Sequence, residues 1–189
     1  MSSNATDVEI IDVRPHHRID DDALAAYMAE NVEGFAGPLT VRQFQGGMSN
    51  PTYILETPSR RYVMRKKPPG ELLKSAHQVD REYKVMAALK GTDVPVPKVH
   101  CLCMDDDVIG QAFYIIEHVY GRVLYAPAAP HFSKADRSAL YLVLLRILCA
   151  VHLVVRAAVG LGVYRRPEDY GSLPHVSWLH QHAGSLRAG

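Results

Sequence analysis

The fold is decided by the stretch FQGGMSNPTYIL (residues 44–55), together with YVMRKK (residues 62–67) and VDREYKVMAAL (residues 79–89) that follow it. Apolar side chains alternate with polar ones through the first two segments, and this period of two is typical of half-buried strands. The third segment changes to apolar residues at helical spacing. Three closely spaced strands with tight turns predict an antiparallel meander that leads into a helix.

The rest of the chain extends this pattern on both sides. Residues 1–19 are predicted to be irregular, and Asp20 begins a short helix whose first turn is acidic. Two further strands are predicted after VPVPKV, because proline disfavours helix at the residue before it. A long helix is expected to begin after Ser133 as its N-cap and to reach about Ala158. The predicted strands span residues 39–44, 52–57, 61–67, 99–104 and 111–121, and the helix after the third strand spans residues 75–90.

Composition excludes several classes of protein. Of the 189 residues 48% are hydrophobic and 22% are charged, and the formal net charge is +1, so neither nucleic acid nor an anionic membrane is an expected partner. The three cysteines lack the repeated pairs of a zinc site, and we expect no bound metal from them. The longest apolar run, residues 140–155, is too short to cross a bilayer. No secretory signal opens the sequence, which predicts a cytoplasmic protein.

The turn between the first two strands is the first candidate site. Gly46 and Gly47 let the backbone approach a ligand closely and present its N–H groups, a common way to hold a phosphate. Ser49 and Asn50 add side-chain donors. A Gly-Gly turn is also common in plain hairpins, so this turn by itself does not establish a binding site.

A carboxylate on the following helix is the second candidate. Glu82 lies three residues after Val79 and four before Met86, on the same apolar stripe. A carboxylate turned toward a core needs a partner, unless it reaches solvent past the edge of the helix. The preceding strand offers Arg65 and Lys66, of which alternation points only one toward the helix. Protein kinases pair a strand cation and a helix carboxylate in this way to hold nucleotide phosphates.

The third candidate is FYIIEHVYG, residues 113–121, a strand that ends in a short segment and a glycine. Such a segment can serve as a hinge whose backbone contacts a nucleotide base, although an exposed strand end has the same pattern. The small lobe of a kinase has the same features in the same chain order: a glycine turn, a strand cation, a helix carboxylate and a hinge.

The amino-acid sequence of these segments, together with VPVPKVHCLC and FYIIEHVYGRVL, resembles the aminoglycoside-phosphotransferase-like family. The resemblance extends from about Phe44 to Tyr170. The closest likeness is to the branch that is also fused to acyl-CoA dehydrogenase domains. The resemblance implies an α+β fold: a protein-kinase-like N-lobe, with a five-stranded antiparallel sheet and one main helix, and the first helices of a mostly helical C-lobe. It implies an N-terminal extension over residues 1–36, the N-lobe over 37–121 and the start of the C-lobe over 122–189.

The resemblance also assigns roles to the candidates. It implies that Gly46, Gly47, Ser49 and Asn50 cover the phosphates of ATP or GTP bound with Mg²⁺. Arg65 takes the place of the phosphate-binding cation, with Lys66 as the competing assignment, and Glu82 takes the place of its partner. The adenine hinge corresponds to Glu117, His118 and Val119, whose backbone atoms would make the contact.

The chemistry of the family requires more than these residues. An intact member would transfer the γ-phosphate to the hydroxyl of a small molecule through an HGDLxxxN segment, and the 189 residues contain no such segment. No residue is therefore predicted to be catalytic, and we expect a truncated product, a fragment or an isolated domain. The alternatives are a non-catalytic binding or scaffold module, or the head of a dehydrogenase fusion. The apolar helix at residues 140–155 is expected to promote association.

Overall fold

The computed structural model describes residues 9–45, 50–68, 79–121 and 132–154. Gly46, Gly47 and Ser49 of the glycine turn lie outside this part of the chain, as do the beginning of the predicted helix at Ser75 and everything after Val154.

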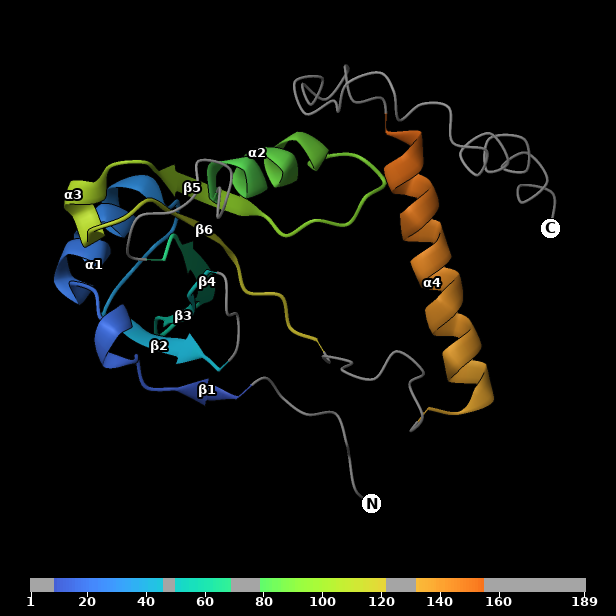
Figure 1. Cartoon of the computed structure of the whole chain (residues 1–189), viewed down its shortest axis with the longest axis horizontal. Helices are drawn as coiled ribbons and strands as arrows, with labels where there is room; N and C mark the ends of the chain where they lie inside the picture. Colours follow the sequence, from blue (N-terminus) through green and yellow to red (C-terminus); the bar gives the residue numbers. More distant parts are fainter. Residues whose placement is uncertain (1–8, 46–49, 69–78, 122–131, 155–189) are drawn as a thin grey trace.

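A single antiparallel sheet organises the molecule (Figure 1). The order of its six strands is β1-β2-β3-β4-β6-β5. The predicted α+β class is confirmed, with one strand more than the five expected. Their bounds are β1 Ile10–Ile11, β2 Thr40–Phe44, β3 Thr52–Glu56, β4 Arg61–Lys66, β5 Val99–Cys103 and β6 Phe113–Glu117.

The additional strand corrects the prediction that residues 1–19 are irregular. Strand β1 pairs with β2 through Ile10 opposite Phe44, and a 3-10 turn, η1, follows at Pro15–His17. Two residues are too few for an alternating pattern to be recognised in the sequence, which is why this edge strand was not predicted.

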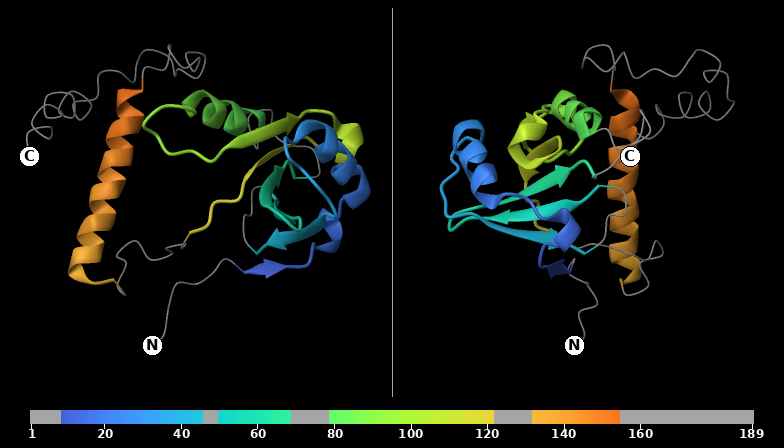
Figure 2. Two further views of the ribbon diagram at one scale, coloured as in Figure 1. Left: turned by 180° about the vertical axis from the view of Figure 1, so that it is seen from behind. Right: turned by 60° about the vertical axis from the view of Figure 1, so that its left-hand side comes forward.

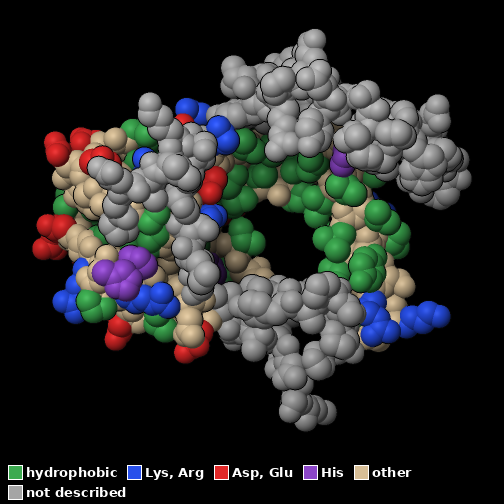
Figure 3. Space-filling model, viewed as in Figure 1, with side chains coloured by type: hydrophobic (Ala, Val, Ile, Leu, Met, Phe, Trp, Pro, Cys, Tyr) green, Lys and Arg blue, Asp and Glu red, His purple; other side chains and the backbone are tan. Residues whose placement is uncertain are grey.

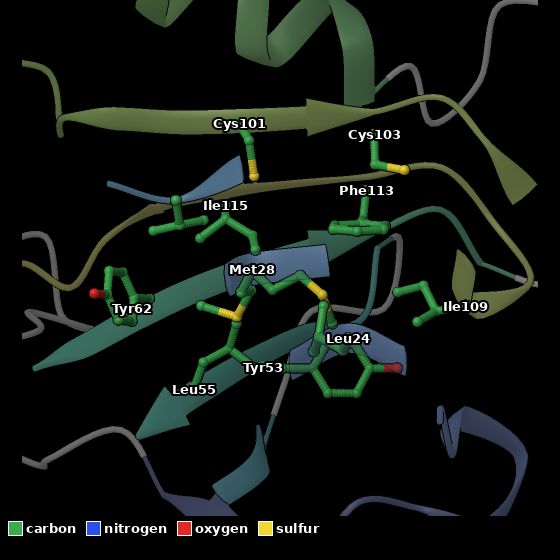
Figure 4. Close-up of a cluster of buried hydrophobic side chains, with 12 residues drawn as sticks. Leu24, Met28, Tyr53, Leu55, Tyr62, Cys101, Cys103, Ile109, Phe113 and Ile115 are labelled. Atoms are coloured by element: carbon green, nitrogen blue, oxygen red, sulfur yellow. The ribbon is translucent and has the colours of Figure 1, made fainter. Parts of the chain in front are cut away.

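Helix α1, Asp21–Asn31, begins where the acidic residues predicted it. The Asp20 carboxylate accepts a hydrogen bond from the Ala23 backbone N–H at 2.9 Å, which caps the helix. Leu24 and Met28 of α1 are fully buried against one face of the sheet, where they meet Tyr53 and Phe113 among others (Figure 4). This face holds the main core.

Helix α2, Val79–Leu89, covers the opposite face of the sheet. Val79 packs there with Tyr114 of β6, and Tyr83 and Met86 extend the contact. Because side chains alternate along a strand, neighbouring residues of β4 and β6 point to different helices. This alternation decides which side chains can meet those of α2.

Two smaller features differ from the sequence-based expectation. The polar turn predicted at Asp105–Asp107 forms a short helix, α3, Asp106–Ile109, which begins with Asp105 as its cap and ends at Gly110 with a positive φ of 87°. The last described helix, α4, Lys134–Leu153, has the predicted N-cap, since the Ser133 hydroxyl accepts from the Asp136 backbone N–H. It ends at Leu153, five residues before the predicted end, because Val154 adopts an extended conformation.

Helix α4 stands apart from the sheet (Figures 1 and 2) and has no buried residue. Hydrophobic side chains lie along its length (Figure 3). Among the helices that the structure describes, none is long and apolar enough to cross a membrane.

Candidate functional site

Strand β4 separates the two candidate cations onto opposite faces of the sheet. Arg65 lies opposite Thr52 of β3 and Tyr114 of β6, on the face that α2 covers. Lys66 points to the face of α1 and is only 3% exposed. Burial lowers the pKa of Lys66, because the charged ammonium loses its hydration there. Only Arg65 is therefore placed beside the helix carboxylate.

Glu82 of α2 reaches that same face and meets Arg65. The Nε atom of Arg65 lies 3.4 Å from Oε2 of Glu82, an ion pair in which both side chains remain about one-third exposed. Because both side chains are partly exposed, both groups stay partly hydrated and the desolvation cost is small. The apolar stripe of α2 thus faces the sheet and brings Glu82 with it. Arg65 is the partner that the Glu82 carboxylate was expected to need.

Two further side chains contact the same carboxylate. The Tyr114 hydroxyl donates a hydrogen bond to Oε2 of Glu82 at 2.8 Å, and Nδ2 of Asn50 donates to Oε1 at 3.4 Å. Tyr114 and Asn50 are buried, whereas Glu82 is not. The four residues come from β4, α2, β6 and the end of the glycine turn, and we call them the carboxylate cluster.

Asn50 connects this cluster to the glycine turn. It is the first described residue after Ser49, and its backbone oxygen accepts a hydrogen bond from the Thr52 hydroxyl at 3.3 Å. The other predicted residues of the turn, Gly46, Gly47 and Ser49, lie outside the described part of the chain. The structure therefore fixes where the turn ends, directly beside the Arg65–Glu82 pair.

The predicted hinge residues differ in what they contact. Glu117 is tied to the segment before β5: its backbone N–H donates to the Lys98 oxygen at 2.9 Å, and its carboxylate accepts from the Lys98 N–H at 2.7 Å. The His118 ring packs edge-on against Tyr120, with ring centroids 4.5 Å apart. Val119 is exposed. Both the side chain and the backbone N–H of Glu117 thus bond to the segment before β5.

A second charged cluster lies near the hinge on the face of α2. Arg42 and Arg61 both pair with the carboxylate of Glu56, and Nε of Arg42 donates to it at 3.0 Å. These hydrogen bonds and charges lower the pKa of Glu56. Arg61 and Glu56 are close enough to influence His118, whose pKa is lowered first by burial and then by Arg61. Sequence reasoning did not single out these residues.

Tyr114 was also missed, although the sequence held a signal for it. Tyr114 lies two residues before Ile116 in FYIIE, so the side chains of both point to the same face of the sheet. A tyrosine in an otherwise apolar strand has a hydroxyl that needs a partner when it is buried. Its register opposite Arg65 could not be derived without the pairing of β4 with β6.

Comparisons with known proteins show which family the chain resembles. Residues 40–188 match the phosphotransferase enzyme family. The chain is 42% identical over 197 residues to a protein of Arabidopsis thaliana described as the acyl-CoA dehydrogenase IBR3, and 38% identical over 187 residues to human acyl-CoA dehydrogenase family member 11. These matches include 100% and 96% of this chain, respectively, but only 24% of the length of each relative.

One solved structure is also similar. It is a crystal structure from Ralstonia eutropha described as an aminoglycoside phosphotransferase, with 47% sequence identity and a TM-score of 0.72. The match covers 91% of this chain and 50% of that one. The chain therefore spans about a quarter of the length of the curated relatives and half of the solved structure.

Proposed function

Because the chain belongs to the phosphotransferase enzyme family, we propose that it binds ATP or GTP with Mg²⁺ between the glycine turn, Arg65 and the hinge. Arg65 would contact the phosphates with its guanidinium, whose planar fork suits phosphate oxygens. Gly46, Gly47, Ser49 and Asn50 would cover the phosphates, and the backbone of residues 117–119 would contact the base. Lys66 would take no part.

The observation that carries this proposal is the meeting of Arg65 with Glu82 at the end of the glycine turn. A strand cation next to a helix carboxylate is the arrangement with which kinases position the phosphates of a nucleotide. The pair is partly exposed and Glu82 also contacts Asn50, the residue that follows the glycine turn, which supports a role in ligand binding.

We further propose that the intact protein transfers the γ-phosphate to a small-molecule hydroxyl. Mg²⁺, when bound with the nucleotide, would neutralise the charge that develops on the phosphates. The 189 residues contain no His-Gly-Asp sequence. They would therefore bind nucleotide without transferring phosphate, with residues 37–121 as the binding unit. The names of two relatives include acyl-CoA dehydrogenase, which supports a role beside acyl-CoA chemistry as part of this proposal.

Binding of Mg-ATP, measured by isothermal titration calorimetry, tests the proposal. We expect the 189-residue chain to bind weakly, and Arg65→Ala to lose about tenfold or more in affinity, since a charge-assisted contact is removed. Arg60→Ala is the matched control, because Arg60 is an exposed arginine in the turn between β3 and β4. The control should bind as the wild type does. A folded wild-type chain that binds no Mg-ATP at millimolar concentration would refute the nucleotide site.

A further inference from the structure

The Glu82 carboxylate is held by two neutral donors as well as by a cation. Tyr114 is 3% exposed and Asn50 is 2% exposed, so both approach Glu82 from inside the protein. The side chain of Arg65, by contrast, is 37% exposed. The three contacts with Glu82 differ in their distances.

The hydrogen bond from Tyr114 is the tightest of the three. At 2.8 Å it is a normal charge-assisted contact between a hydroxyl and a carboxylate. The Nε atom of Arg65 is 3.4 Å away, and this buried atom forms no hydrogen bond with any residue that the structure describes. Tyr114 rather than Arg65 therefore makes the shorter polar contact between Glu82 and the sheet.

The hydroxyl of Tyr114 stays a donor over the whole neutral range of pH. Burial raises the pKa of Tyr114, and the neighbouring Glu82 carboxylate raises it further. The ring also packs near Tyr83 of α2, with centroids 6.4 Å apart, so the same residue contacts the helix through its ring and through its oxygen.

Arg65 lies beside both the Glu82 carboxylate and the Tyr114 hydroxyl. Its guanidinium carries five N–H donors, and the contact with Glu82 occupies none of them in good hydrogen-bond geometry. In the register of the sheet Arg65 lies between Tyr114 and Thr52, the residue that begins β3 after the glycine turn. An anchored Glu82 can hold Arg65 in place through charge without using up its donors.

We propose that Tyr114 is a positioning residue for the phosphates of the bound nucleotide. Its hydroxyl fixes Glu82, and Glu82 in turn keeps the guanidinium of Arg65 beside the start of β3. This inference rests on the proposed nucleotide site and adds to it a residue that contacts neither base nor phosphate.

The test separates phosphate binding from general stability. Dissociation constants for Mg-ATP and for adenosine, measured by NMR titration of the 189-residue chain, are compared for the wild type and Tyr114→Phe. We expect Tyr114→Phe to weaken Mg-ATP about tenfold, as the loss of a hydrogen bond to a charged group would. Adenosine, which has no phosphate, should bind both proteins within twofold. In a Glu82→Gln background, Tyr114→Phe should have no further effect on Mg-ATP.

Tyr53→Phe is the matched control. Tyr53 is a fully buried tyrosine of the same sheet whose hydroxyl also donates at 2.8 Å, but to the His17 backbone oxygen on the face of α1. It should lose stability without losing the preference for Mg-ATP over adenosine. Equal losses for both ligands in Tyr114→Phe, no loss for either, or a variant that does not fold would overturn the inference. A wild type that binds no Mg-ATP would instead refute the nucleotide site itself.

Discussion

Arg65 and Lys66 are adjacent in the sequence, yet the alternation of strand β4 gives them different surroundings. Arg65 keeps solvent and a carboxylate partner, whereas Lys66 is buried on the core face. None of the ion pairs among the described residues includes Lys66. At this position a protonated ammonium costs free energy that no carboxylate in the described part of the chain offsets.

We predict that Lys66→Met stabilises the chain by about 1–3 kcal/mol at pH 7. Methionine is similar in size to lysine, so the substitution removes the buried charge and keeps the packing. The pKa of Lys66 is lower in the folded chain than its ordinary value of 10.5, so the unfolded chain binds more protons between those two values. The stability of the wild type should therefore rise with pH toward 10.5 and approach that of the variant. Urea unfolding at pH 7 and pH 10 measures both effects.

The same variant separates the two cations. Lys66→Met should bind Mg-ATP as the wild type does, whereas Arg65→Ala should not. A Lys66→Met chain that is folded but has lost nucleotide affinity would reverse the assignment.

At the scale of the elements, the two faces of the sheet depend on different helices. Helix α2 serves the carboxylate cluster, and α1 closes the main core with Leu24 and Met28. Leu24→Ala is expected to reduce the free energy of unfolding by about 2–5 kcal/mol, the usual cost of a cavity left by a buried leucine. Ala26→Gly, on the exposed side of the same helix, should cost only about 1 kcal/mol. Equal losses in denaturant unfolding would show that α1 does not close the core.

The sequence was sufficient for the elements that have a clear period. The hairpin of β2 and β3, strand β4 and the stripe that carries Glu82 could all be predicted, because alternation and helical spacing extend over five or more residues in each. Strand β1 has no such pattern. The contacts of Tyr114 and Asn50 with Glu82 depend on strand order and register, which place residues 32 positions apart within hydrogen-bond distance.

At the scale of the whole molecule, helix α4 has an unusual surface. Leu142, Leu145 and Leu148 are between 48% and 60% exposed, and further apolar residues of α4 are exposed to a similar degree (Figure 3). Soluble monomers rarely expose a continuous apolar patch of this kind. The match covers only half of the similar solved structure, so that protein has additional residues with which such a surface could be covered there.

We predict that the 189-residue chain associates through α4. In size-exclusion chromatography with light scattering, the mass should rise above 21.0 kDa as the concentration increases. Replacing Leu145 and Leu148 together by lysine should shift the chain toward the monomer, because charges at these positions resist burial in an interface. Ser138→Lys adds a charge near the polar beginning of α4 and should leave the association unchanged. A wild-type chain that stays monomeric at every concentration and binds no hydrophobic dye would contradict the prediction, since the apolar side chains of α4 would then have to be covered within the monomer.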